Sequence, residues 1–209
     1  IYFFEQKIME NKEKKFNLAK ELHQSGKVNE AQIVYLELLN NNPSDHLINF
    51  LTGTTYLQLK NYKTALTYLD KSININQEFP HSYNSKGVVF SEMKNYEEAI
   101  KNYDKAILFK PDFLEAHLNR GISLKNIQKF DDALKSFEKC IEIDSLNPKI
   151  YNNLGNLFIK NLKYTDAKDA YDKAIMFNNK YAEAYEGRGD ALQEIAKIEK
   201  DPNKLSLSI

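Results

Sequence analysis

The chain has 209 residues, and its 29 basic and 29 acidic side chains cancel to no net charge. A protein built to bind polyanions carries a basic excess, so we expect no nucleic acid partner. The single cysteine, Cys140, excludes an internal disulfide and a zinc site made of cysteines. Seven glycines and five prolines are too few for the many turns of an all-β protein, so the composition favours helices.

The N-terminal residues do not resemble an export signal. Residues 1–4 are apolar, but the stretch is too short and lacks a basic opening. Met9 is a plausible true start, and we expect residues 1–11 to be an extension ahead of the folded part. No apolar run is long enough for a transmembrane helix. We therefore expect a cytoplasmic protein without a membrane partner.

A spacing of 34 residues recurs along the chain, beginning with the small residue Ala19. The series keeps its phase without an insertion, and self-similarity at a fixed period of this length is typical of tandem repeats. The residues that follow Ala19 at this spacing are Gly53, Gly87, Gly121, Gly155 and Gly189, and a second series 12 residues later is Ala31, Ala65, Ala99, Ala133 and Ala167.

We number each repeat unit so that the residue of the first series is position 8. The units then cover residues 12–45, 46–79, 80–113, 114–147 and 148–181, and a partial sixth unit covers 182–200. Within unit three, apolar residues at helical spacing stop at Lys94-Asn95, resume at Tyr96 and end at Lys110-Pro111, because proline cannot continue a helix. Each unit is therefore predicted to be an antiparallel pair of helices.

The small residues at positions 8 and 20 have a predicted role in packing. They let the two helices of a unit approach closely, while aromatic residues at positions 11, 17 and 24 fill the space beside them. The pattern stops in unit six, where position 20 is Asp201 and Pro202 follows. We expect either a long closing helix over residues 184–200 or an array that has been cut, with 201–209 as a tail.

Residues that carry chemistry are scattered through the array. The four histidines have no spacing typical of a metal site, and Cys140 is at a position where other units have alanine, which favours a packing role. The acidic pairs Glu97-Glu98 and Asp131-Asp132 are at the starts of predicted helices, where they complement the helix dipole. We therefore expect no metal, no cofactor and no enzymatic activity in this chain.

The repeated residues resemble the tetratricopeptide repeat family, for example in the stretch Tyr151-Asn-Asn-Leu-Gly-Asn156 with Tyr164, Ala167 and Tyr171. The resemblance extends over nearly the whole chain and implies an all-α, right-handed solenoid. It also implies a concave groove, lined by the first helix of each unit, that binds a protein or peptide segment. The sequence thus predicts a protein–protein interaction scaffold.

The predicted groove is rich in asparagine. Asn17, Asn119 and Asn153 share position 6, an arrangement similar to the asparagine ladder of O-linked N-acetylglucosamine transferase. A side-chain amide both donates and accepts hydrogen bonds, so a ladder of amides can bind a peptide backbone. The alternative is that solvated asparagines reflect the composition of the chain, which has 23 of them. The predicted peptide-binding residues are Asn17, Phe50, Asn84, Asn119, Lys149, Asn152, Asn153, Asn156 and Lys160.

Other interpretations stay open. A carboxylate clamp of the family is not favoured, because only Asn119 and Lys149 match its five residues. The apolar cluster of Leu47, Phe50 and Leu51 is either a hydrophobic anchor for a partner or is covered by residues 1–4. The incomplete sixth unit suggests self-association.

Residues 18–31 suggest an alternative to the scaffold function. Together with Tyr35 and Pro43, this opening stretch is similar to the start of bacterial repeat proteins that continue into a glycosyltransferase or sulfotransferase. This resemblance implies that the array is the substrate-recognition arm of a larger enzyme.

Overall fold

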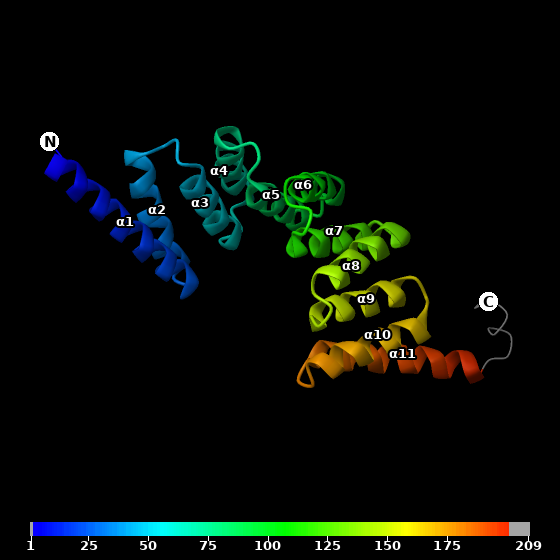
Figure 1. The fold of residues 1–209 in the computed structure, drawn as a ribbon. Helices are drawn as coiled ribbons and strands as arrows, with labels where there is room; N and C mark the ends of the chain where they lie inside the picture. Colours follow the sequence, from blue (N-terminus) through cyan, green and yellow to red (C-terminus); the bar gives the residue numbers. More distant parts are fainter. Residues whose placement is uncertain (1, 201–209) are drawn as a thin grey trace. The chain divides into compact units, whose positions relative to one another are not determined.

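The computed structural model describes residues 2–200, with side chains from residue 11 onward, and every regular element in this range is an α-helix (Figure 1). The chain divides into two compact units, Ile1–Pro111 and Asp112–Ile209, which we call the N-terminal and C-terminal units. The N-terminal unit contains α1 (Tyr2–Gln24), α2 (Val28–Asn41), α3 (His46–Gln58), α4 (Tyr62–Ile75), α5 (Pro80–Glu92) and α6 (Tyr96–Phe109). The C-terminal unit contains α7 (Leu114–Asn126), α8 (Phe130–Ile143), α9 (Pro148–Lys160), α10 (Tyr164–Phe177) and α11 (Ala182–Lys200).

The helices form the predicted pairs. We call the odd-numbered helices first helices and the even-numbered helices second helices, because each repeat contributes one of each in that order. Every first helix from α3 to α11 begins at position 1 of its predicted repeat. Helix α1 begins earlier, so residues 2–11, predicted as an extension, are helical and continuous with the first repeat. The all-α solenoid with a 34-residue repeat is thus confirmed.

The turn inside each pair has a common geometry. Position 15 has a left-handed backbone in the first five repeats, with φ of 79° at Gly26, 57° at Lys60, 60° at Lys94, 61° at Gln128 and 59° at Leu162. Glycine adopts this conformation readily, whereas other L-residues are strained in it. The turn is therefore built with strain in four of the five repeats.

Position 8 is confirmed as a point of close approach between helices. A Cβ atom added to Gly87 would lie 2.5 Å from Tyr103 Cε1, and one added to Gly121 would lie 2.6 Å from Phe137 Cε1. The contact residue is at position 24 in each case, so the missing side chain makes room for a ring of the second helix. The alanines at position 20 are fully buried beside it, which confirms their predicted packing role.

Gly189 departs from this rule. A Cβ atom added there would meet no atom within 4 Å, because no second helix follows α11 in the described residues. Its neighbour Gly187, at position 6, packs instead on the ring of Tyr171 from the preceding repeat. The long closing helix predicted for residues 184–200 is present as α11.

Two departures from the usual repeat pattern have local explanations. Ser72 occupies a position where alanine is usual, and its buried hydroxyl donates to the carbonyl oxygen of His46 at 2.8 Å and lies 2.7 Å from the Ser82 hydroxyl. Cys140 is fully buried, and burial raises the pKa of its thiol to about 12. Cys140 therefore has the predicted packing role, since a buried neutral thiol is unreactive.

Candidate functional site

The first helices form the inner side of each unit. Helix α3 contacts α5 in the N-terminal unit, and in the C-terminal unit α9 contacts both α7 and α11. Within each unit, a second helix contacts the first helices that precede and follow it. Adjacent first helices that touch one another define the concave side of a curved stack. The predicted binding residues all belong to these helices.

Two asparagines of α9 are oriented by hydrogen bonds inside the protein. The Asn153 amino group donates to the carbonyl oxygen of Lys149 at 2.8 Å. Asn156 has the opposite orientation, because its Oδ1 accepts the hydroxyl of Tyr171 at 2.8 Å. The Oδ1 atom of Asn153 and the amino group of Asn156 remain for other partners. One residue thus offers an acceptor and the other a donor, and both side chains are only half-buried.

Asn152 differs from the expectation that it is an exposed groove residue. Its exposed fraction is only 8%, and its Oδ1 has no hydrogen-bond partner in the described residues. The Asn152 side chain forms a hydrogen bond with Tyr181, the residue just before α11. Tyr181 therefore lies against Asn152, and it comes from the end of the same repeat. An unsatisfied acceptor at this depth costs free energy until a donor reaches it.

A pair of lysines lies beside the asparagines. Lys125 of α7 is half-buried, and burial together with the positive charge of Lys160 on α9 lowers the pKa of Lys125. Neither lysine has an acidic partner in the part of the chain that the structure describes. Lys125 was not among the predicted binding residues, although its position 12 belongs to the inner face. Lys149 and Lys160 are exposed as expected, and Asn119 of α7 is half-buried.

The remaining predicted residues belong to the N-terminal unit. Asn17 of α1 is exposed, and Asn84 of α5 is half-buried. Phe50 of α3 packs edge-on against Phe79, with ring centroids 5.3 Å apart, so part of its apolar surface is covered within its own unit. The alternative in which residues 1–4 cover this cluster depends on side chains outside the described residues.

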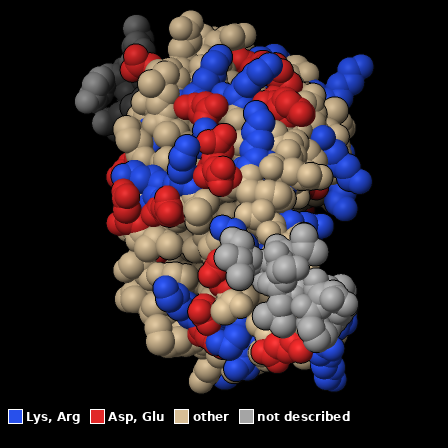
Figure 2. All heavy atoms as spheres, turned by 90° about the vertical axis from the view of Figure 1, so that its right-hand side faces the viewer, with Lys and Arg blue, Asp and Glu red and all other residues tan. Residues whose placement is uncertain are grey.

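Charges of both signs are mixed on the surface drawn in Figure 2, and the described residues hold no cluster of metal ligands. Acidic and basic side chains are interspersed with uncharged ones on the face drawn in Figure 2. No group of three or more histidine, cysteine, aspartate or glutamate side chains could hold a metal ion within the described residues. None of the helices among these residues is long and apolar enough to cross a membrane.

Models of the tetratricopeptide repeat match four segments of the chain. The segments are residues 16–82, 114–145 and 136–169, each described as a tetratricopeptide repeat, and residues 89–128, described as a TPR repeat. A search of curated proteins finds no match.

Solved structures of similar proteins have the same fold. YrrB, described as a TPR protein with an unusual peptide-binding site, is 23% identical with a TM-score of 0.69, and the match covers 89% of this chain and 97% of that one. A thermophilic TPR protein of Thermus thermophilus is 19% identical, with a TM-score of 0.73 and coverage of 87% and 99%. MamA from Desulfovibrio magneticus is 17% identical, with a TM-score of 0.71 and coverage of 82% and 97%. At these identities the likeness establishes the fold, and together with the matched segments it identifies the chain as an array of tetratricopeptide repeats.

Proposed function

We propose that this chain is a non-catalytic scaffold that binds an extended segment of another protein along α7 and α9. The observation that carries the proposal is the opposite orientation of Asn153 and Asn156, with an acceptor on one and a donor on the other. An extended peptide needs both, because its backbone carries N–H and C=O groups in turn. The proposal has no role for a cofactor.

The spacing of the two amides fits an extended backbone. Residues three apart on a helix are neighbours, with Cβ atoms about 5–6 Å apart. An extended chain advances about 3.3 Å per residue, so Asn153 and Asn156 match polar groups one or two residues apart. The unsatisfied Oδ1 of Asn152 supplies a further acceptor on the same helix once Tyr181 moves aside.

The lysine pair adds a preference for acidic segments. Lys125 and Lys160 have no acidic neighbour among the described residues, so the local electrostatic potential is positive. A carboxylate that binds between them relieves their mutual repulsion. The peptide-binding site in the description of YrrB is a property of that protein, but it makes peptide recognition a reasonable expectation for an array of this fold. The partner we expect is thus an extended segment with acidic side chains.

The test uses a random peptide library displayed on phage and selected on the full chain, followed by fluorescence anisotropy with the selected peptides. Asn156→Asp keeps the acceptor for Tyr171 but removes the donor, and we expect it to weaken binding by roughly three- to tenfold. Asn153→Ala should weaken binding by a similar factor. Lys125→Gln should reduce both the enrichment of acidic peptides and the salt dependence of their binding.

The matched control is Asn179→Ala, since the Asn179 side chain is exposed in the turn between α10 and α11 and makes none of the proposed contacts. Circular dichroism establishes that each variant keeps its helix content. The proposal fails if the selected peptides bind the Asn153 and Asn156 variants as tightly as the unchanged chain. It also fails if Asn179→Ala weakens binding as much as they do.

Helix α11 supports a second candidate, self-association of the chain. Tyr185 and Leu192 of this helix are 47% and 41% exposed, and no described residue fills the space beside Gly189. Tyr185, Gly189 and Leu192 are at positions 4, 8 and 11, the face that a first helix normally turns toward its second helix. Sedimentation velocity over a range of concentrations tests this candidate, with Leu192→Glu as the variant expected to abolish any dimer.

A further inference from the structure

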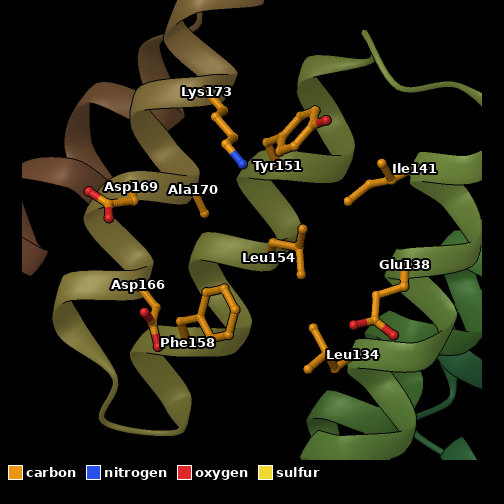
Figure 3. Close-up of a pocket in the computed structure, with 10 residues that line it drawn as sticks. All are labelled: Leu134, Glu138, Ile141, Tyr151, Leu154, Phe158, Asp166, Asp169, Ala170 and Lys173. Carbon is orange, nitrogen blue, oxygen red and sulfur yellow. The ribbon is translucent and has the colours of Figure 1, made fainter.

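A hollow of about 270 Å³ lies on the outer side of the C-terminal unit, away from the asparagines of the proposed groove. Helices α8 and α10 form its walls and α9 its floor (Figure 3). Leu154 and Phe158 of α9 and Leu134 of α8 give it an apolar base, and Glu138 of α8 is at its edge. Such a hollow between packed helices calls for an explanation, because repeat interfaces are normally filled.

Two equivalent places in the array are bridged by a cation. Lys86, at position 7 of its repeat, forms an ion pair with Asp70, at position 25 of the preceding repeat, with Nζ and Oδ1 2.5 Å apart. Arg188 and Asp172 are at the same two positions, and their Nε and Oδ1 atoms are 2.6 Å apart. In both cases a long basic side chain crosses from a first helix to the preceding second helix.

The hollow occurs where this bridge is missing. Position 7 of the fifth repeat is Leu154, and position 25 of the fourth repeat is Glu138. Leu154 is buried and too short to cross to α8, so Glu138 keeps its carboxylate without an ion-pair partner in the described part of the chain. The hollow is thus the space that the stem of Lys86 or Arg188 occupies at the two bridged interfaces.

The charges around the hollow favour a cation. Asp166 of α10 is exposed and, like Glu138, has no ion-pair partner among the described residues. Lys173 is the basic residue of the lining, and its Nζ lies over the ring of Tyr151, 5.8 Å from the centroid. Figure 3 draws Lys173 and Tyr151 toward one end of the hollow and Glu138 with Leu134 toward the other. The Glu138 end is therefore acidic above an apolar base.

We infer that this hollow is a binding site for a lysine or arginine side chain of a partner protein. The aliphatic stem packs on Leu154 and Phe158, and the cationic head reaches Glu138, as Lys86 reaches Asp70 within the chain. The site is on the opposite side of α9 from Asn153 and Asn156, so it acts independently of the proposed groove. An array with both sites binds an acidic segment on its inner side and a basic residue on its outer side.

The experiment uses N-acetyl-arginine amide and N-acetyl-lysine amide as probes and methyl NMR spectra of the full chain as the readout. Both probes should give saturable shifts of the Leu134 and Leu154 methyl signals, in the millimolar range expected for ligands of this size. N-acetyl-norleucine amide has the aliphatic stem without the charge. Its affinity should be lower than that of the charged probes by a factor of at least about five. Glu138→Gln should reduce binding of the charged probes by a similar factor.

Two reciprocal variants make the test specific. Leu154→Arg supplies the missing bridge from within the chain and should abolish probe binding while leaving the helix content unchanged. Lys86→Leu removes the bridge to Asp70 and should create a second saturable site, reported by shifts of the Leu66 methyl signals. The inference is overturned if the norleucine probe binds as well as the arginine probe, if Glu138→Gln changes nothing, or if the shifts do not saturate. None of these outcomes depends on the peptide selected for the inner face.

Discussion

Replacing Gly155 by alanine is expected to destabilise the C-terminal unit, whereas the same replacement at Gly189 is expected to stabilise it. Both residues are at position 8 of a repeat and both are inside a helix. Alanine is favoured over glycine in a helix interior by about 0.8–1.0 kcal/mol, and this contribution is the same at the two sites. The difference between the variants therefore reports the packing around each glycine.

The space around Gly155 is already occupied. An added Cβ atom would lie 2.5 Å from Cε1, 2.6 Å from Cζ and 2.7 Å from Cδ1 of Tyr171. The ring cannot simply retreat, because Gly187 also packs on it and its hydroxyl is bonded to Asn156. Overpacking of this kind costs roughly 1–3 kcal/mol, and loss of the hydrogen bond costs about 1 kcal/mol more. After the helix contribution is subtracted, Gly155→Ala should destabilise by about 1–3 kcal/mol.

Among the described residues, no atom would lie within 4 Å of a Cβ atom at Gly189, so the helix contribution acts alone there. For a chain of this length, about 1 kcal/mol shifts the melting temperature by about 2–4 °C, which far-ultraviolet circular dichroism measures easily. Gly189→Ala should melt higher by about that amount and Gly155→Ala lower by at least as much. Hydrogen exchange, read by mass spectrometry, should localise both changes to α9, α10 and α11.

Tyr171→Leu provides the internal control, because the second repeat pairs its position 8 glycine, Gly53, with Leu69. In the Tyr171→Leu background, Gly155→Ala should cost less than it does beside tyrosine, and the double-mutant cycle measures this coupling. A Gly155→Ala protein as stable as the original chain would refute the packing argument. So would a change of the same sign at Gly155 and Gly189.

Two further predictions concern the strained turns and the buried thiol. Leu162→Gly should raise the free energy of unfolding by about 1 kcal/mol, because the left-handed backbone strains leucine and the residue is 71% exposed, so little packing is lost. Gly26→Leu should lower the free energy of unfolding for the same reason. Urea denaturation measures both changes. Alkaline pH should destabilise the fold, because the unfolded chain releases the Cys140 proton near the ordinary pKa of 9.0 while burial raises the pKa of the folded thiol to about 12. The stability contributed by the neutral thiol is therefore fully present below pH 9.0 and is lost as the pH rises toward about 12. Cys140→Ala should make the urea midpoint fall less steeply with pH. An equally steep fall in that variant would contradict this assignment.

The repeat architecture could be predicted because its packing rules are local and periodic. Gly87 and Gly121 each pack on a residue 16 positions later in the same repeat, so one spacing captures the contact. The same reasoning fails for Gly189, which continues the glycine series but has no side chain of a following helix packed on it in the described residues. A periodic pattern indicates what a residue can pack against, but it does not indicate whether the partner helix is present.

The candidate site could be predicted only as a set of positions. The sequence places Asn152, Asn153 and Asn156 on one helix, but it does not tell which amide atom each one presents. Those orientations depend on Lys149 within the helix and on Tyr171 from another. Asn152 is buried, and its contact is with Tyr181, which follows it by almost a full repeat. The similarity of the opening stretch to transferase repeat regions stays a prediction.

The outer hollow was missed although its signal is in the sequence. Positions 7 and 25 pair Lys86 with Asp70 and Arg188 with Asp172, whereas Leu154 lies at position 7 opposite Glu138. The two positions belong to different repeats, 16 residues apart, so a search for features within one repeat does not find them. The structure made the pairing visible because it brings the two helices together.

Tyr171 is shared between two repeats. Its ring lies against Gly155 in its own repeat and Gly187 in the next, so the fifth repeat is fully packed only when α11 is in place. During synthesis at the ribosome, the segment through residue 177 emerges before residue 187, and the ring is then covered on one side only. We therefore expect the fifth repeat to complete its packing only after α11 has left the exit tunnel. Until then, Asn156 accepts its hydrogen bond from a tyrosine whose ring does not yet have its contact with Gly187.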